Sequence, residues 1–405
     1  MIHHLRMLAT PRRAAVAATL AIPLFLVLAG CRPSRTTSQY VEIPAGSFAR
    51  GWTADLRLGA GDRVVALTPL GDQLIVQTAN NTVYSLSTGG GTLKWSSQVA
   101  APGRLLGRPA LAGDRIVFPA VDRLIVYTKF GQRERELELS RAIRSPLSAT
   151  GEFVYVGFDY VGQGRLGRIS LEQPFVPVRW ELLTRGAVSA APALFQDTIF
   201  AASEDGNVYA VSDERSPLWA TPGNVFSTGG PITADVKADD SGVYVASTDS
   251  KLYALDRQTG KLKWQFFAGQ PLHTAPMVTD DTVYQYVPGK GVVALEKIAG
   301  AYNREPKWVV ESAVRPLAQD AQRVYMQAGD SNVIAVDRKT GKIVFSTKRA
   351  DLRVFAGSAS STADMVYAAT EAGIVLGIKP VTTGGTTGQL VRGADPVDPV
   401  ASAAR

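Results

Sequence analysis

The stretch Ala254–Trp264, with the sequence Ala-Leu-Asp-Arg-Gln-Thr-Gly-Lys-Leu-Lys-Trp, decides the fold of this chain. Apolar residues stand at both ends of it, and a polar segment with Gly260 separates them. Glycine can adopt the positive φ that a tight turn requires. Asp256 stands at the start of this segment, where a carboxylate can accept hydrogen bonds from the backbone of a turn. The stretch therefore predicts two short β-strands joined by a turn that Asp256 and Gly260 build.

A further apolar run precedes this stretch, and near-copies of that run recur along the chain. The eight copies are residues 73–76, 115–118, 153–156, 198–201, 242–245, 282–285, 323–326 and 365–368. Equivalent positions lie 38 to 45 residues apart. The copies are rich in β-branched and aromatic residues, and no helical periodicity accompanies them. A period of about forty residues made of strands alone is typical of a β-propeller, in which each repeat forms one four-stranded blade.

A proline precedes six copies of this marker strand. The six are Pro109, Pro146, Pro192, Pro231, Pro276 and Pro316. Because proline has no N–H, it fits an edge strand or the start of a strand, and the innermost strand of a blade is such an edge. A proline that only ends the preceding loop would explain the same pattern, so both interpretations stay open at this point.

One large aromatic residue marks the predicted fourth strand of most repeats. It is Trp95, Trp180, Trp219, Trp264 or Trp308, with Phe345 in this place in the seventh repeat. A ring in each repeat can pack between neighbouring blades and bury much apolar area there. We therefore interpret these rings as core rather than as a stack that holds a ligand. Asp337 and Gly341 repeat the turn of Asp256 and Gly260.

The eighth repeat has no fourth strand of its own, because no aromatic residue follows position 378. Trp52 lies before the first repeat, in a segment that resembles the missing strand. We predict that residues 50–56 hydrogen-bond to residues 374–378 and so cover an open sheet edge. The predicted fold class is all-β: an eight-bladed β-propeller of four-stranded antiparallel blades, closed by the N-terminal strand that completes the last blade.

The N-terminus has the features of a secretory signal. Arg6, Arg12 and Arg13 precede an apolar run that is short for a membrane-spanning helix. The run ends in Leu28-Ala29-Gly30-Cys31, which closely resembles the bacterial lipobox. This resemblance implies cleavage before Cys31 and attachment of lipid, palmitate included, to that residue. An uncleaved membrane helix with an incidental cysteine is the alternative.

These features divide the chain into four parts. We expect a lipoprotein signal peptide at 1–30, a lipidated Cys31 with a flexible tether at 31–47, the propeller at 48–380 and a disordered tail at 381–405. Several acyl chains on one cysteine would hold the protein on a membrane.

Composition argues against several classes of function. With one cysteine and three histidines among 405 residues, the chain cannot form an internal disulfide and has little material for a transition-metal site. We expect His273 to be an ordinary loop or channel residue. Asp239-Asp240 and Asp280-Asp281 could bind calcium, but turn acids explain them better. The net charge of +7 includes three signal-peptide arginines, and the remaining +4 without a basic run argues against nucleic acid. We therefore expect no catalytic residue, no metal and no cofactor.

The pattern Ala-x-Asp-x-x-Thr-Gly-Lys-x-x-Trp at 254–264 resembles the repeat of PQQ-type propellers. Together with the lipobox, the tether and eight blades, it resembles the BamB family of outer-membrane protein assembly factors. That resemblance implies a non-enzymatic, outer-membrane-anchored scaffold that faces the periplasm. It also implies docking to a BamA-like barrel-assembly protein and its associated lipoproteins, as a monomer within a complex.

One segment resembles the loop that this family presents to its partner. It comprises Leu182, Leu183, Arg185 and Gly186, with Thr184 between them. An arginine among exposed aliphatic residues suits a protein-binding anchor. A structural connector in which Gly186 eases the turn is the alternative. The family's companion acidic loop would fall near residues 226–231, and no acid is present there.

Two other functions fit the same fold. A propeller can bind a small molecule, a glycan or a quinone-related ligand in its central channel. It can also be a structural module of an envelope complex that has no role in barrel assembly.

Overall fold

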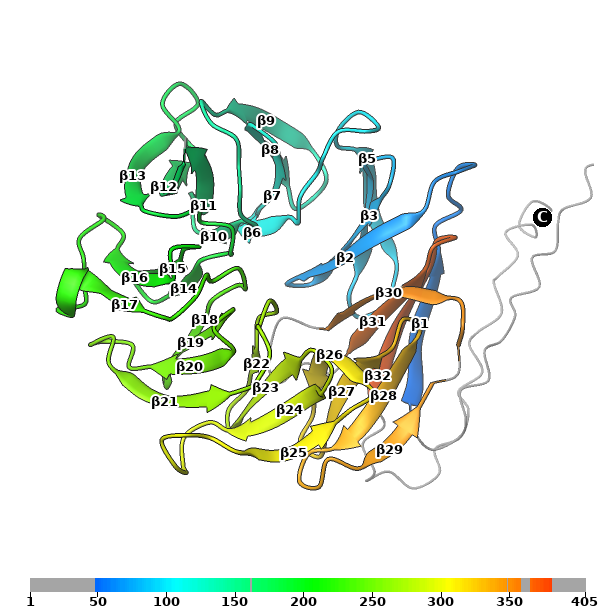
Figure 1. Cartoon of the computed structure of the whole chain (residues 1–405). Coiled ribbons are helices and arrows are strands. Elements are labelled where there is room, and N and C mark those ends of the chain that lie inside the picture. The colour runs from blue at the N-terminus through cyan, green and yellow to red at the C-terminus, as the bar shows by residue number, and fades with distance from the viewer. Residues whose placement is uncertain (1–47, 161, 348, 358–364, 381–405) are drawn as a thin grey trace, which may run out of the picture. The chain divides into compact units, whose positions relative to one another are not determined.

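The computed structural model describes residues 48–160, 162–347, 349–357 and 365–380, and nearly all of its regular structure is β-strand (Figure 1). The expected signal peptide, the lipidated Cys31, the tether and the tail at 381–405 lie outside the described residues. Among the described residues, no helix is long and apolar enough to cross a membrane.

The described strands form eight four-stranded antiparallel sheets, which are the blades of the predicted propeller (Figure 1). Blades 1 to 4 contain β2 Val64–Leu70, β3 Gln73–Thr78, β4 Thr82–Ser87 and β5 Leu93–Gln98; β6 Ala110–Ala112, β7 Arg115–Ala120, β8 Arg123–Thr128 and β9 Arg133–Glu138; β10 Ser148–Thr150, β11 Phe153–Tyr160, β12 Gln163–Ser170 and β13 Val178–Thr184; and β14 Ala193–Phe195, β15 Thr198–Ala202, β16 Asn207–Ser212 and β17 Val225–Ser227. Blades 5 to 8 contain β18 Lys237–Asp239, β19 Gly242–Ser247, β20 Lys251–Leu255 and β21 Leu262–Phe267; β22 Met277–Val278, β23 Thr282–Val287, β24 Gly291–Glu296 and β25 Pro306–Val310; β26 Ala313–Gln319, β27 Arg323–Ala328, β28 Asn332–Asp337 and β29 Ile343–Ser346; and β30 Leu352–Gly357, β31 Val366–Thr370, β32 Ile374–Pro380 and β1 Phe48–Asp55.

Each predicted marker segment lies in the second strand of a different blade, which confirms the repeat. These second strands are apolar because both faces of each sheet are covered by neighbouring blades; β19, for example, is buried along its whole length. The prolines are divided between the two interpretations. Pro109, Pro192 and Pro276 directly precede an inner edge strand, and Pro316 lies inside β26 at an irregularity of its pairing. Pro231, by contrast, lies in the loop well before β18.

The N-terminal strand closes the ring as predicted. β1 pairs with β32 in an antiparallel register that places Trp52 opposite Gly377 and Asp55 opposite Ile374. Figure 1 shows the two strands side by side, although they come from opposite ends of the chain. Trp52 is buried in a cluster that joins blade 8 to Val64 and Leu67 of blade 1. The strand therefore completes one blade and seals the ring at the same time.

Every junction between neighbouring blades has its own apolar cluster, and the eight clusters together make up the core. Six tryptophans add a repeated hydrogen bond at these junctions, because each indole Nε1 donates to a backbone oxygen of the next blade. The pairs are Trp52 with Thr88 (2.8 Å), Trp95 with Lys129 (3.0 Å), Trp180 with Asp213 (2.7 Å), Trp219 with Arg257 (2.9 Å), Trp264 with Lys297 (2.8 Å) and Trp308 with Arg338 (2.9 Å). The predicted core role of these rings thus includes an inter-blade bond.

The two remaining junctions have a different side chain in place of tryptophan. In blade 2, Arg135 stands opposite Val126 as Trp95 stands opposite Ser85 in blade 1. Its Nη1 donates to the backbone oxygen of Leu171 in blade 3, 2.9 Å away. In blade 7, Phe345 packs against the core at the junction with blade 8, but a phenyl ring has no N–H to donate.

The turn glycines of the repeat are needed for this packing. Gly260 has φ of 71°, and a Cβ placed on it would lie 2.5 Å from a ring atom of Trp219. Gly341 stands in the same relation to Trp308, at 2.6 Å. The motif residue Gly260 therefore serves the preceding blade as well as its own turn, because only a residue without a side chain lets the ring approach.

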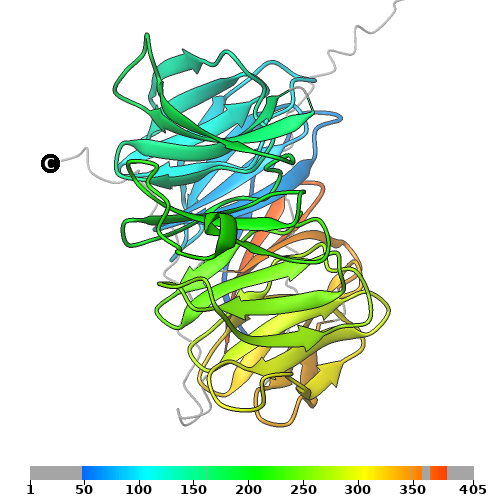
Figure 2. The ribbon, with the colours of Figure 1, turned by 60° about the vertical axis from the view of Figure 1, so that its left-hand side comes forward.

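One predicted position is wrong. Trp219 does not lie on the fourth strand of blade 4, which is β17. It lies in the irregular segment before that strand, where Pro217 and Pro222 interrupt the ladder and a 3-10 turn forms at Pro222–Asn224. Figure 2 brings this turn to the front of the view. Trp219 still reaches the blade 4–5 core and is 1% exposed.

The aspartates of the motif hold its turns. Asp256 Oδ1 accepts hydrogen bonds from the backbone N–H of Thr259 (2.8 Å) and from its hydroxyl (2.7 Å), and Asp337 makes the same contacts with Thr340. The threonine hydroxyl holds the pKa of each aspartate below its usual value. Both turns are therefore built for the charged form of the carboxylate.

We expect the contribution of Asp256 to stability to depend on pH. Since the folded-state pKa is depressed, the contribution is fully present above the unfolded-state value of about 3.9 and is lost as pH falls through the lower folded-state pKa. Urea denaturation should show that Asp256→Ala lowers the unfolding midpoint at pH 7 and does so less at pH 3. Asp256→Asn, which keeps an uncharged acceptor, is the control and should lose this pH dependence. An equal deficit of the alanine variant at both pH values would contradict the assignment.

Candidate partner-binding surface

The candidate segment 182–186 occupies the end of β13, the outer strand of blade 3, and the start of the connection to blade 4. Side chains alternate along a strand, so neighbouring residues of this segment face opposite ways. Leu182 is half-buried and packs against the cluster that contains Ile199 and Val211 of blade 4. Leu183 points the other way and is 51% exposed. Of the predicted aliphatic pair, only Leu183 is therefore free to meet a partner.

Gly186 belongs to a structural connector. Its backbone oxygen accepts hydrogen bonds from the hydroxyls of Thr184 and Ser203, each at 2.8 Å. A Cβ on Gly186 would lie 2.4 Å from the backbone nitrogen of Asp205, so the close approach of the blade 4 turn requires glycine here. This arrangement supports the connector interpretation for Thr184 and Gly186.

The connection from blade 4 to blade 5 repeats the same arrangement. The Gly230 oxygen accepts hydrogen bonds from Thr228 (2.7 Å) and Ser247 (3.1 Å) there. The backbone nitrogen of Gly229 donates to Asp249, as that of Arg185 donates to Asp205. Gly229 thus has the place of Arg185, which shows that the connector does not need the arginine side chain.

The side chain of Arg185 is the variable element of the segment. It is exposed, and among the described residues its guanidinium makes no hydrogen bond or ion pair. A long cationic side chain on a backbone that is fixed on both sides loses little backbone freedom when it binds. Exposed Arg185 and Leu183 together present a charge and an apolar side chain at one edge of blade 3.

An acidic turn lies beside Arg185, although residues 226–231 contain no acid. Glu204 and Asp205 form the turn between β15 and β16, and the Asp205 carboxylate accepts the Arg185 backbone N–H at 3.2 Å. Burial alone would raise the pKa of Asp205, but hydrogen bonds from Asn207 and its other donors outweigh burial and hold the pKa below its usual value. Sequence reasoning missed this turn because it belongs to a different blade; the signal was the Ser-Glu-Asp-Gly run at 203–206.

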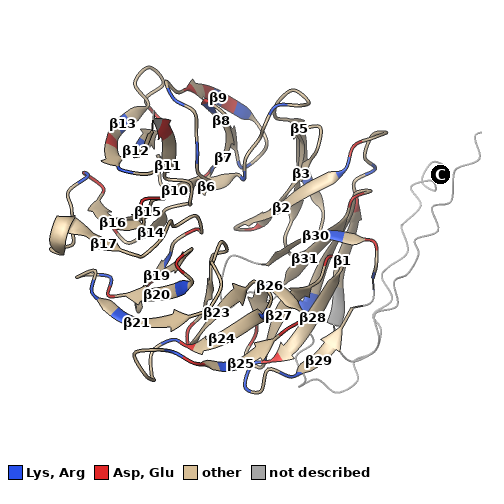
Figure 3. Ribbon diagram, in the orientation of Figure 1, with Lys and Arg blue, Asp and Glu red and all other residues tan. Residues whose placement is uncertain are grey.

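Arginines also flank the solvent side of β13. Glu181 accepts hydrogen bonds from Arg165 (2.7 Å) and Arg141 (3.1 Å) at its carboxylate, and its backbone oxygen accepts one from Arg215 (3.0 Å). Figure 3 shows Lys and Arg interspersed with Asp and Glu, many of them at strand ends and in turns. The region around residues 182–186 is therefore of mixed charge, as is usual for surfaces that select a protein partner.

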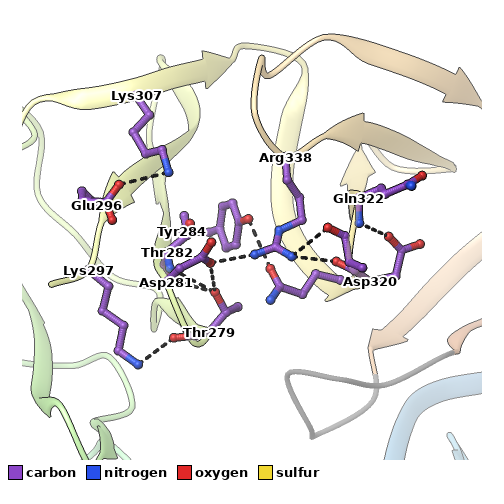
Figure 4. A network of polar contacts seen from close by, with 12 residues as sticks. Thr279, Asp281, Thr282, Tyr284, Glu296, Lys297, Lys307, Asp320, Gln322 and Arg338 are labelled. Carbon is purple, nitrogen blue, oxygen red and sulfur yellow. Dashed lines mark hydrogen bonds and ion pairs between the residues drawn. The ribbon is translucent and has the colours of Figure 1, made fainter. Parts of the chain in front are cut away.

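One member of each acidic pair, Asp239-Asp240 and Asp280-Asp281, forms an ion pair with the next blade. Asp239 pairs with Lys297 of blade 6 at 2.6 Å. Asp281 pairs with Arg338 of blade 7 at 2.7 Å, and Figure 4 shows this second pair. Within the described ranges, no three His, Cys, Asp or Glu side chains lie close enough to hold a metal ion. Asp239 Oδ1 also accepts the backbone N–H groups of Ser241 (2.8 Å) and Gly242 (3.2 Å), which supports its interpretation as a turn acid.

His273 faces a hollow of about 300 Å³ at the inner strands of blades 5 to 7. Its Nδ1 lies 3.3 Å from the hydroxyl of Thr233, and Asp235 and Arg315 line the same hollow. Asp235 also forms an ion pair of 2.8 Å with Arg108 of blade 2. The described contacts of His273 join it to a hydroxyl rather than to a carboxylate that would orient it as a general base.

Comparison with known proteins places the chain in a family. The family model PQQ_2, described as outer membrane protein assembly factor BamB, matches residues 38–220, 204–316 and 303–392. A curated protein of Moranella endobia, described as outer membrane protein assembly factor BamB, is 27% identical over 133 residues. The match covers 31% of this chain and 33% of that relative, so the chain spans about a third of the length of the curated relative it matches.

Solved structures share the fold. BamB from Moraxella catarrhalis matches with a TM-score of 0.63 at 17% identity, covering 82% of this chain and 98% of that chain. The computationally designed Ika8 protein matches with the same TM-score at 15% identity, covering 83% and 100%. Since a computationally designed protein fits equally well, these likenesses concern architecture.

Proposed function

Since the chain belongs to the family described as outer membrane protein assembly factor BamB, a family of PQQ-like β-propellers, we propose that it is a non-enzymatic scaffold of outer-membrane protein assembly. In this proposal the signal peptide at 1–30 is removed, Cys31 carries lipid, and residues 31–47 tether the propeller to the outer membrane on its periplasmic side. The chain acts as a monomer within a complex that contains a BamA-like barrel-assembly protein and associated lipoproteins. It needs no cofactor.

The observation that carries the docking part of the proposal is the pair Leu183 and Arg185. Both side chains are exposed on a backbone that Gly186 and Asp205 fix against blade 4. Arginine is enriched among the residues that dominate binding energy, and a fixed backbone reduces the entropy lost on binding. The acidic turn at Glu204 and Asp205 adds a second charge that a partner can recognise.

Replacement of Arg185 by glutamate tests the docking surface. A charge reversal at a central anchor should cost about 2 kcal/mol or more, which is about thirtyfold in affinity. Co-purification of the barrel-assembly protein from detergent-solubilised envelope should therefore fall strongly. Lys339→Glu, a reversal at an exposed turn residue of blade 7, is the control and should leave co-purification unchanged.

Gly186→Ala separates the connector from the anchor. It should lower the melting temperature, because the added Cβ collides with the blade 4 turn, whereas Arg185→Glu should not. Full retention of the partner by a folded Arg185→Glu variant would rule out this surface. Absence of the barrel-assembly protein from the wild-type pull-down would reject the assembly role itself.

The lipid anchor is tested separately. Labelled palmitate should be incorporated into the wild-type chain and not into the Cys31→Ser variant.

A further inference from the structure

A pocket of about 340 Å³ lies at the junction of blades 5 and 6, on the sheet face next to Trp264. Its volume is in the range of about 300–1,000 Å³ that ligand pockets occupy. Lys263, Lys297 and Arg304 line it, and none of its eleven lining residues is acidic. The rings of Trp264 and Tyr244 form its apolar side. We call it the blade 5–6 pocket.

Lys263 forms no ion pair among the described residues, unlike the lysines at the same position in blades 1 and 6. A lysine directly precedes the junction tryptophan in blades 1, 5 and 6. Lys94 pairs with Asp72 in blade 1, and Lys307 pairs with Glu296 at 3.1 Å in blade 6 (Figure 4). Lys263 donates only to the backbone oxygen of Ser241, 2.8 Å away, as far as the described residues show.

The repeat explains this difference. Asp72 occupies the turn between the first two strands of blade 1, directly before Gln73. In blade 5 the equivalent residue, directly before Gly242, is Ser241. Blade 5 thus has a hydroxyl group at the Asp72 position. Asp256, which has the place of Glu296 of blade 6, is held in its own turn by Thr259 and forms no ion pair with Lys263 among the described residues.

Arg304 is a second cation without an acidic partner. Its side chain is 5% exposed, and its guanidinium donates to the backbone oxygens of Ala301 (2.6 Å) and Ile298 (3.0 Å). It also lies over the Trp264 ring, 5.1 Å from the ring centre. No ion pair of Arg304 is found among the described residues. Burial lowers the pKa of Arg304, because its removal from water outweighs the nearby negative charge of Glu296.

A longer loop closes the pocket. Blade 6 uses nine residues, 297–305, between its third and fourth strands, whereas blade 5 uses six, 256–261. This loop is held against β21, because Gln265 donates to the Tyr302 oxygen (2.9 Å) and accepts from the Arg304 backbone nitrogen (2.7 Å). The longer loop of blade 6 thus places Arg304 beside the blade 5 sheet, on which Lys263 lies.

We propose that the blade 5–6 pocket binds a small phosphate-class oxyanion between Lys263, Lys297 and Arg304. Lysine and arginine both form strong charge-assisted hydrogen bonds to phosphate oxygens. Lys297 is 5% exposed. Its ammonium group pairs with Asp239 and donates to the Thr279 backbone oxygen, which leaves one of its three hydrogens for a ligand. The bound anion would supply the negative charge that Asp72 and Glu296 provide to the corresponding lysines of blades 1 and 6. This site is independent of the proposed docking surface on blade 3.

Calorimetric titration of the full chain with inorganic phosphate at low ionic strength tests the proposal. We expect saturable binding at one site. Lys263→Met should weaken it about tenfold or more, the loss expected for one charged hydrogen bond. Lys307→Met is the matched control, because that lysine already has Glu296, and should leave phosphate affinity within about twofold of wild type. Glycerol phosphate serves as the second probe: tighter binding of it than of inorganic phosphate assigns a lipid headgroup, and equal or weaker binding assigns a free anion.

Two results would overturn the site. One is the absence of saturable binding of either probe by the wild type. The other is an equal effect of the two lysine variants, which would mean that phosphate responds to net charge alone. Lys263 is exposed, so its variant should keep the wild-type melting temperature and remains informative even if Arg304→Gln unfolds the loop.

Discussion

Trp219→Ala is expected to lower the free energy of unfolding by about 3–5 kcal/mol, the cost typical of deleting a large buried aromatic side chain. Trp219 is 1% exposed, lies 5.9 Å from the Phe200 ring and donates its indole N–H to Arg257 of the next blade. Its loss would leave a cavity at the blade 4–5 junction and an unpaired carbonyl beside it. Chemical denaturation, monitored by far-UV circular dichroism so that the signal does not depend on tryptophan fluorescence, would measure the change.

Trp219→Phe distinguishes packing from hydrogen bonding. Phenylalanine keeps most of the apolar contact and loses the N–H, so we expect a cost of about 1–2 kcal/mol. Blade 7 packs Phe345 of its fourth strand into the junction with blade 8, so a phenyl ring at a blade junction is compatible with this fold. Phe175→Ala, at a ring that is 97% exposed, is the control and should change stability by less than about 0.5 kcal/mol. If the phenylalanine and alanine variants were equally unstable, the indole bond would dominate instead of packing.

Removal of β1 is expected to have the second large effect. A chain that starts at residue 57 would lose Trp52 from the blade 8–1 cluster, which costs about 3–5 kcal/mol by itself. It would also expose the edge of β32, which now pairs with β1 along its length. An open sheet edge invites pairing with another chain. Size-exclusion chromatography with light scattering should therefore show oligomers, and the melting temperature should fall.

A chain that starts at residue 43 is the control, because it keeps all of β1. It should remain monomeric with the melting temperature of the longer chain. Addition of a peptide with the sequence of residues 48–57 to the shorter chain should restore the monomer by refilling the edge. A chain from residue 57 that is monomeric and equally stable would show that closure by β1 is dispensable.

The stability of the blade junctions bears on the proposed scaffold function. Leu183 and Arg185 can act as anchors only because the connector holds their backbone against blade 4. That connector in turn depends on the blade 3–4 and blade 4–5 junctions, where Trp180 and Trp219 lie. We therefore expect Trp219→Ala to weaken partner binding indirectly, whereas Arg185→Glu weakens it without loss of stability.

The sequence by itself determined the repeat, the number of blades, the closing strand and the turns of Asp256 and Gly260. These features depend on residues that are close along the chain or on a pattern repeated eight times, and alternation and turn chemistry report them directly. The pairing of β1 with β32 was predictable because a strand was missing at one end and present at the other.

Only the tertiary structure decided where the side chains of the candidate sites lie. In the structure, Trp219 lies outside the fourth strand, and Leu182 packs against blade 4 while Leu183 is exposed. The Glu204–Asp205 turn lies next to Arg185. It also brought the 297–305 loop over Lys263. Each of these contacts joins different blades or depends on which face of a strand is covered. Packing between blades decides such contacts, and no local pattern within one repeat specifies them.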